Sequence, residues 1–135
     1  MKILSSDRKS HIEIERIDFA DFVNYSASVE IGDFTARQDS IALSDVTGFL
    51  DRLHQFERTR SGEVILEGGE DFQLLIRALD DVGHLWIGIR IVRYTFLPTP
   101  WVGDKLRFSG GFDFDPEFAN QLFANLRGIL RGTSQ

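Results

Sequence analysis

Residues 63–94 read EVILEGGEDFQLLIRALDDVGHLWIGIRIVRY, and this stretch decides the fold class. It contains three apolar runs, at 63–67, 72–79 and 84–94. The runs have the length and the β-branched content of strands, and turn sequences rich in glycine and aspartate separate them. Connections this short join antiparallel neighbours, so the stretch predicts a meander.

Outward from the meander, alternation of apolar and polar residues predicts further strands on both sides. Three strands are expected before the meander and one after it. The Gly32-Asp33 pair is expected to form a hairpin turn between two of the early strands. The expected ranges are 11–17, 22–31, 34–43 and 105–112.

Two amphipathic helices are expected, one between the two groups of strands and one at the C-terminal end. The first has Ser44 as its N-cap, with Asp45 near the positive end of the helix dipole, and stops at Ser61-Gly62. The second starts at Asp115-Pro116-Glu117, an N-cap followed by proline at the first helical position, and ends near Gly132. The apolar stripes are Val46, Phe49, Leu50, Leu53 and Phe56 in the first helix, and Phe118, Leu122, Leu126 and Ile129 in the second.

The sequence therefore predicts a single α+β domain over residues 1–135, with a folded core over about 10–131 and the order βββ-α-ββββ-α. The strands should form a predominantly antiparallel curved sheet or half-open sandwich of about six to seven strands, covered by the two helices. The residues expected in the core are Phe49, Leu53, Phe72, Leu74, Ile76, Ile87, Ile89, Leu122 and Leu126.

The composition argues against several classes of protein. There is no cysteine, which removes disulfides, thiol catalysis and cysteine-ligated zinc. The net charge of −6 argues against a nucleic-acid partner, because phosphate binding needs a basic surface. The first residues are too polar for a signal peptide, and no apolar run reaches the roughly 18 residues of a membrane span, so we expect a cytoplasmic protein. Phenylalanine accounts for 12 of the 16 aromatic residues, which we interpret as core filling.

No metal, cofactor or catalytic site is expected. The three histidines, His11, His54 and His84, lie on different predicted elements and lack the spacing of a metal motif. Asp113 and Asp115 could form a catalytic pair, but we interpret Asp115 as the helix cap and Asp113 as a solvated turn residue. Ser109-Gly110-Gly111-Phe112 lacks the lysine and the context of a phosphate loop, which favours a bulge or kink in a strand.

Candidate partner-binding residues come from charge and from one tryptophan. The segment 62–81 carries six acids against Arg77 alone, a local net charge of 1 − 6 = −5. Successive turns of a meander lie at opposite ends of the sheet, so we expect the acids to form two separate clusters. Trp101 lies in a loop flanked by prolines, where it could be an interface anchor or a lid on the core. The acids of the two turns are Glu67, Glu70 and Asp71, and Asp80 and Asp81.

An ordered series of short segments resembles a known family. The segments are 43–53, 61–68, 71–74 and 83–87, which read LSDVTGFLDRL, SGEVILEG, DFQL and GHLWI. They are similar to the small bacterial immunity proteins of polymorphic toxins and to related uncharacterised domains, typified by the immunity partner of wall-associated tRNA-nuclease toxins. The resemblance covers roughly residues 10 to 131. It implies stoichiometric binding of a toxin and carries over no catalytic residue.

Two functional hypotheses and one structural alternative follow. The first is a non-catalytic protein-binding domain, an immunity protein that neutralises a cognate toxin and meets a basic toxin domain with its carboxylates. The second is a small-ligand-binding or enzymatic domain with a pocket between sheet and helices, near His84, Trp86 and Arg90, with Tyr94 further along. The third is a structural homo-oligomer that pairs exposed strand edges. We expect a monomer or weak homodimer, and we name the Arg90/Arg93/Arg107 region as an alternative interface.

Overall fold

The computed structural model describes residues 1–96 and 103–132 of the chain. Within these residues the fold is α+β, with eight β-strands, two α-helices and one short 3-10 helix. The strands form two antiparallel sheets of four strands each, which we call the N-terminal sheet and the C-terminal sheet. The predicted class, mainly antiparallel strands with two helices, is therefore confirmed.

The N-terminal sheet has the strand order β1-β2-β3-β4. A long hairpin joins β2 to β3, in register up to the Asp18–Val23 pair. Gly32-Asp33 forms the two-residue turn between β3 and β4, as the sequence predicts. The strands are β1 (Lys2–Leu4), β2 (His11–Asp18), β3 (Val23–Ile31) and β4 (Phe34–Ile41).

The C-terminal sheet has the order β5-β6-β7-β8 and contains the predicted meander. The ladder between β7 and β8 runs without a register shift from the Leu85–Phe114 pair to the Phe96–Gly103 pair. The segment Ser109-Gly110-Gly111-Phe112 is part of a strand, as predicted, and the bulge that the sequence favours there is absent. The strands are β5 (Glu63–Gly68), β6 (Phe72–Ala78), β7 (Leu85–Phe96) and β8 (Gly103–Phe114).

Helix α1 (Val46–Thr59) connects the two sheets, and its N-cap is Asp45, not Ser44 as predicted. The Asp45 carboxylate accepts a hydrogen bond from the backbone N–H of Gly48 at 3.2 Å. Ser44 instead bridges to β5, where its backbone N–H donates to the Glu67 carbonyl at 2.9 Å. Because Ser44 pairs with β5, it lies outside the helix, and the following residue, Asp45, serves as the N-cap.

Asp115 begins the last helical segment, as predicted. Its carboxylate accepts from the backbone N–H of Glu117 at 3.0 Å, at the start of a 3-10 turn (η1, Pro116–Phe118) that leads into α2 (Ala119–Arg131). The expected apolar stripe is wrong at Phe118, which is 52% exposed because it lies on the 3-10 turn; Phe123 occupies the core instead.

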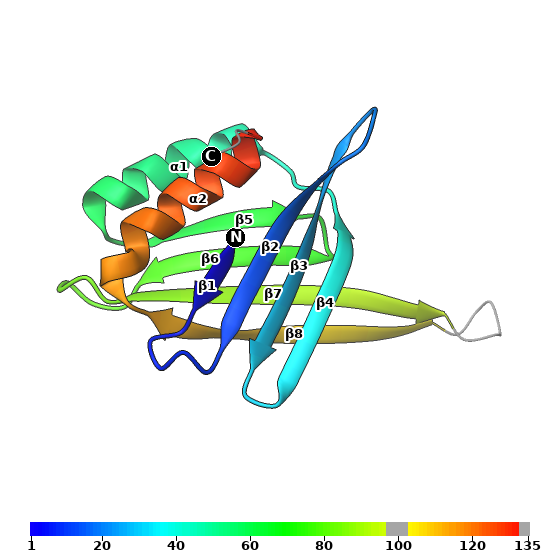
Figure 1. The fold of residues 1–135 in the computed structure, drawn as a ribbon, viewed down its shortest axis with the longest axis horizontal. Helices are drawn as coiled ribbons and strands as arrows, with labels where there is room; N and C mark the ends of the chain where they lie inside the picture. The colour runs from blue at the N-terminus through cyan, green and yellow to red at the C-terminus, as the bar shows by residue number, and fades with distance from the viewer. Residues whose placement is uncertain (97–102, 133–135) are drawn as a thin grey trace.

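The molecule has two layers, and the core lies between them (Figure 1). The C-terminal sheet forms one layer, and the strands of the N-terminal sheet cross it at a steep angle, with both helices beside them. Inward side chains of both sheets and both helices form one hydrophobic cluster. Every predicted core residue is buried in it, namely Phe49, Leu53, Phe72, Leu74, Ile76, Ile87, Ile89, Leu122 and Leu126.

The expected strand count and order, and a single curved sheet of six to seven strands, are wrong. The extra strand is β1, whose three residues are too few to show an alternating pattern. The strands divide into two sheets because α1 intervenes, so that β5 starts a new ladder and does not pair with β4.

Candidate functional site

The two predicted acidic clusters lie on different turns, at opposite ends of β6. Glu67, Glu70 and Asp71 surround the β5–β6 turn, next to the Gly68–Phe72 pair. Asp80 and Asp81 lie in the β6–β7 turn, beyond the Ala78–Leu85 pair. The structure therefore does not bring the five acids together, which agrees with the separation expected for a meander.

Asp80 is committed to its own turn. One carboxylate oxygen accepts from the backbone N–H groups of Val82 at 2.9 Å and of His84 at 3.2 Å. The other oxygen pairs with the Nδ1 of the His84 ring. This bond lowers the pKa of Asp80 and raises the pKa of His84 from their ordinary values. Asp80 and His84 thus form a self-contained turn, and Asp81 is the exposed acid beside it.

The β5–β6 turn keeps its carboxylates on the surface while its backbone is fixed. The Asp71 carbonyl accepts from the backbone N–H of Val92 at 2.9 Å, and the Glu67 carbonyl accepts from Ser44. Glu67 and Glu70 are exposed, and Asp71 is half-buried. A partner would therefore meet this cluster at a rigid position.

Trp101, the predicted anchor, lies outside the described residues, and its role stays a prediction. The structure reveals a different aromatic feature that the sequence analysis missed. Phe19 and Phe22 stack at the tip of the β2–β3 hairpin, with ring centroids 4.6 Å apart and planes 23° apart. Phe19 is 49% exposed and Phe22 is 55% exposed. The backbone N–H of Phe19 donates to the Phe22 carbonyl at 2.9 Å and closes the loop.

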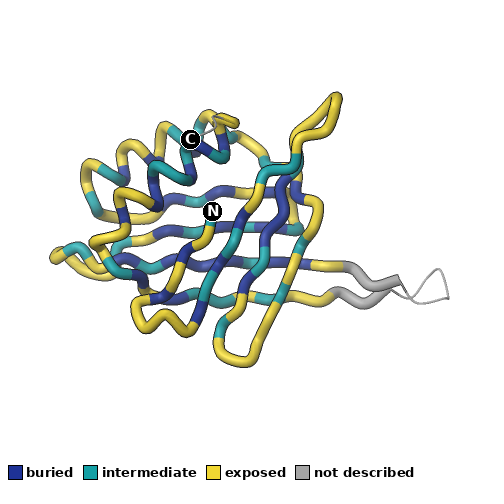
Figure 2. Tube along the Cα trace, viewed as in Figure 1, coloured by how far each residue is buried: buried dark blue, intermediate teal, exposed yellow. Residues whose placement is uncertain are grey.

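This hairpin tip, defined here as residues 18–23, projects beyond both layers (Figures 1 and 2). Its base is held by Arg16, which pairs with Asp18 at 2.8 Å and donates to the Ile129 carbonyl of α2 at 3.1 Å. Asp21, between the two phenylalanines, forms no ion pair with any described residue. The tip therefore presents an aromatic pair and a free carboxylate on an anchored support.

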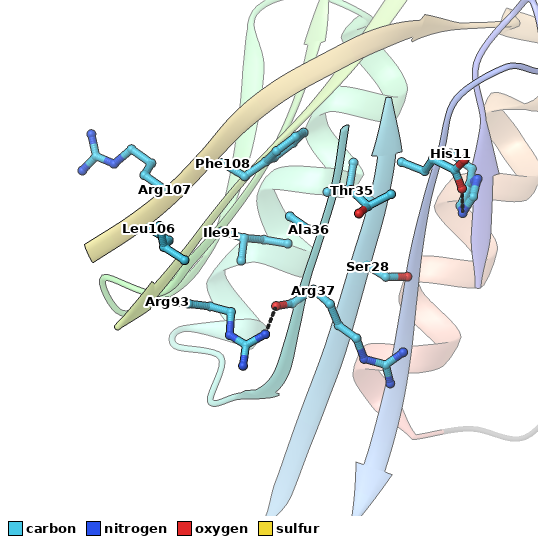
Figure 3. A pocket seen from close by; sticks show the side chains of 12 residues that line it. His11, Ser28, Thr35, Ala36, Arg37, Ile91, Arg93, Leu106, Arg107 and Phe108 are labelled. Carbon is cyan, nitrogen blue, oxygen red and sulfur yellow. Dashed lines mark hydrogen bonds and ion pairs between the residues drawn. The ribbon is translucent and has the colours of Figure 1, made fainter. Parts of the chain in front are cut away.

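A second feature is a hollow of about 670 Å³ where the two sheets diverge (Figure 3). We call it the open-end groove. The β3–β4 hairpin forms one wall and the β7–β8 pair forms the other. Its apolar lining residues are Val29, Ala36, Ile91, Leu106 and Phe108, and its basic ones are His11, Arg37, Arg93 and Arg107. The sequence predicts the Arg90/Arg93/Arg107 region as an alternative interface, and of these residues Arg93 and Arg107 line the groove and Arg90 does not. The groove itself depends on how the sheets cross.

Trp86 and Arg90, two of the residues behind the ligand-pocket hypothesis, do not face the space between sheet and helices, and the Tyr94 side chain lies outside the described residues. Trp86 and Arg90 alternate along β7 with the buried residues Leu85, Ile87 and Ile89, so they lie on the outer face of the sheet. Arg77 stacks on the Trp86 ring, with its Cζ 4.6 Å from the centroid. The inner face of β7 packs in the core cluster, and a hollow of about 300 Å³ that does lie beside a helix, between β1 and α2, is lined by other residues, among them Leu4 and Leu122.

The remaining candidates have local roles. Asp113 accepts a hydrogen bond from the Ser6 hydroxyl at 3.1 Å, and Asp115 caps the last helical segment. His11 lies 3.9 Å from Glu30 across β2 and β3.

Among residues 1–96 and 103–132, no group of three or more histidine or acidic side chains could hold a metal ion. No described helix is both long and apolar enough to cross a membrane.

In comparisons with family models, curated proteins and solved structures, the chain matches none of them.

Proposed function

We propose that this chain is a non-catalytic protein-binding domain, an immunity protein that neutralises a cognate bacterial toxin by stoichiometric binding in the cytoplasm. The observation that carries the proposal is the hairpin tip. Two stacked phenylalanines, each about half exposed, are unusual on a surface unless a partner covers them. Aromatic side chains of this kind dominate the energetics of protein interfaces.

The charge around the tip supports a basic partner. Asp21 lies between the two phenylalanines in the sequence and has no ion-pair partner among the described residues, and the chain carries a net charge of −6. Carboxylates around an apolar anchor speed the encounter with a basic surface and help to exclude acidic competitors. A toxin that acts on nucleic acid has such a surface, because it must bind phosphates.

One of the two acidic turns is on the same side as the tip. In Figure 1 the β6–β7 turn, with Asp80 and Asp81, lies at the opposite end of the molecule from the tip. We therefore assign the β5–β6 turn, with Glu67, Glu70 and Asp71, to the proposed interface. The β6–β7 turn is also less suited to bind a partner, because the Asp80 carboxylate already forms hydrogen bonds within that turn.

The test uses the protein encoded next to this chain's gene, with its C-terminal domain as the toxin candidate. Co-expression of the chain should restore growth, and the two proteins should form a one-to-one complex. Phe22→Ala should raise the dissociation rate by roughly 30-fold, the equivalent of about 2 kcal/mol for an interface anchor. Phe118→Ala is the matched control, since Phe118 is 52% exposed and Phe22 is 55% exposed.

Charge reversals report on the encounter step. Asp21→Lys and Glu67→Lys should slow association at low salt, and the effect should fade as salt rises. Asp81→Lys should leave the association rate unchanged. If the wild-type chain neither binds nor protects, the proposal fails. If it protects and Phe22→Ala binds as tightly as wild type, the tip is not the anchor.

A further inference from the structure

The outer edge of β8 is an unpaired strand edge. The backbone N–H of Val92 points toward β6, where it donates to the Asp71 carbonyl at 2.9 Å. Alternation along the ladder then directs the backbone groups of Arg107, Ser109 and Gly111 away from β7. The Asp113 carbonyl, next in this series, confirms the direction, because it accepts from the Ser6 N–H at 3.0 Å outside the sheet.

The other sheet edges are shorter or partly covered. β1 has three residues, and β5 is bridged by Ser44 and packs against α1. β4 lies close to β7, where the Arg37 carbonyl accepts from Arg93 at 3.5 Å. The edge of β8 from Arg107 to Gly111 has no pairing strand among the described residues. Proteins normally block long edges, so an open one indicates a site for another strand.

The open-end groove runs beside this edge. In Figure 1 the β3–β4 hairpin extends beyond β8, so its inner face continues past the last strand of the C-terminal sheet. Apolar side chains on both walls face solvent there: Phe34 at the hairpin turn is 72% exposed, and Leu106 on β8 is 59% exposed. Phe108 and Ile91 line the β7–β8 wall beside Leu106 (Figure 3). The edge and the groove together form one site with backbone hydrogen-bonding groups and an apolar wall.

We propose that this site binds an extended, acidic peptide segment of another protein, which adds to β8 as a further strand of the C-terminal sheet. The free N–H and C=O groups of Arg107, Ser109 and Gly111 supply the hydrogen bonds of a strand ladder. Alternate side chains of the added strand point into the groove, beside Leu106 and Phe108. This inference does not rest on the proposed function, because the hairpin tip lies at the other end of β3.

Charge selects an acidic segment. Arg107 is exposed, lies on the outer face of β8 and forms no ion pair with any described residue. A carboxylate on the added strand would lie directly across from it, as in a cross-strand ion pair. Arg93 adds positive charge on the groove side, where it donates to the Arg37 carbonyl, whereas the Arg37 guanidinium is already paired with Asp39. A lysine at the position across from Arg107 would place like charges opposite each other and is disfavoured.

A second copy of this chain fits the edge poorly. Ile31 of the β3–β4 hairpin lies over Gly110, with its Cδ1 3.3 Å from the place that a Cβ on Gly110 would occupy. Gly110 is near the middle of the free edge. Two copies paired about a two-fold axis there would bring two overhanging hairpins to the same place. A single extended segment meets no such obstacle.

The test uses the full chain and a synthetic peptide in which valine alternates with aspartate. The peptide should protect the amides of Arg107, Ser109 and Gly111 from hydrogen exchange. A matched peptide with lysine for aspartate should bind roughly tenfold more weakly, since the residue across from Arg107 changes from an attractive to a repulsive cross-strand partner. A peptide N-methylated along one edge should not bind, and it tests the ladder without altering the protein.

Ser109→Pro tests the same point on the protein side. It removes an outward N–H, which is not used by β7, while Ser109→Ala keeps that N–H and should bind as wild type. The Phe19→Ala/Phe22→Ala variant should bind the peptide normally, and Ser109→Pro should still neutralise the toxin candidate. Equal binding of the two charged peptides, or no new protection at the three amides, overturns the proposal. Protection that needs no peptide and rises with protein concentration also overturns it and assigns the edge to a second copy.

Discussion

At the scale of single residues, the Asp80–His84 pair should make the β6–β7 turn sensitive to pH. The raised pKa of His84 means that its contribution to stability is complete below the ordinary histidine pKa and is lost as pH rises through the raised value. The lowered pKa of Asp80 means that its contribution is present above the ordinary aspartate pKa and is lost as pH falls through the lowered value. The turn is therefore most ordered between these limits.

Asp80→Asn should return the pKa of His84 toward its ordinary value, because the carboxylate that stabilises the imidazolium is gone. An NMR titration of the His84 ring measures this directly. Asp81→Asn is the control, since Asp81 makes no hydrogen bond with the ring. An unchanged His84 titration in Asp80→Asn would show that the pair does not persist in solution.

The role of a residue can be predicted from the sequence when its partner is close to it along the chain, and not when the partner lies on a distant strand. Asp115 was predicted as a cap because its partner, Glu117, is two residues away. The need for glycine at position 111 could not be predicted, because the side chain that requires it, Trp86, lies on another strand. The Trp86 ring crosses from β7 and lies 2.2 Å from the place that a Cβ on Gly111 would occupy, so only glycine leaves room for it. An aromatic ring over a glycine on a neighbouring strand restores apolar contact to that strand.

At the scale of elements, the cap at Asp115 decides how the 3-10 turn that leads into α2 begins. Asp115→Ala removes the acceptor for the Glu117 N–H and should lower the free energy of unfolding by about 1 kcal/mol. Asp115→Asn should retain most of that stability, because asparagine caps as well as aspartate. Chemical denaturation of the three proteins measures the difference, with Gln121→Ala, at an exposed uncharged position of α2, as a surface control. Wild-type stability in Asp115→Ala would show that other contacts set the start of the helix.

The strands and helices could be predicted because each carries its own periodic pattern. Alternation placed β6 and β7 within about two residues of their starts, and the apolar stripe placed α1. The same logic failed for β1, which is too short to alternate. Composition is misleading at Phe19 and Phe22, because the abundance of phenylalanine predicts core filling and these two belong to an exposed hairpin tip.

At the scale of the whole molecule, the two sheets are joined by packing and not by a shared ladder. Sequence patterns indicate which face of a strand is apolar, but they carry no information on which sheet it belongs to or on the angle between sheets. The open-end groove is a product of that angle. It could therefore not be predicted, although three of its basic residues, Arg37, Arg93 and Arg107, are plain in the sequence.

A common core also predicts that the two sheets unfold together. Leu53 of α1 and Ile87 of β7 are fully buried in that core, at 0% exposure each. Truncating either one to alanine should cost about 2–5 kcal/mol, through lost burial and the cavity left behind. Because the sheets share these contacts, each variant should lower amide protection by the same free energy at Val29 in the N-terminal sheet and at Ile76 in the C-terminal sheet.

Native-state hydrogen exchange under conditions that report global opening makes this measurement. Leu79→Ala is the matched control, because Leu79 is 45% exposed and its truncation should change little. If Ile87→Ala weakened protection in the C-terminal sheet and left Val29 at its wild-type value, the sheets would be independent cooperative units. The angle between them would then be free to vary, and the open-end groove would be an adjustable space between two units. Equal losses would instead fix the groove as a rigid feature of one cooperative fold.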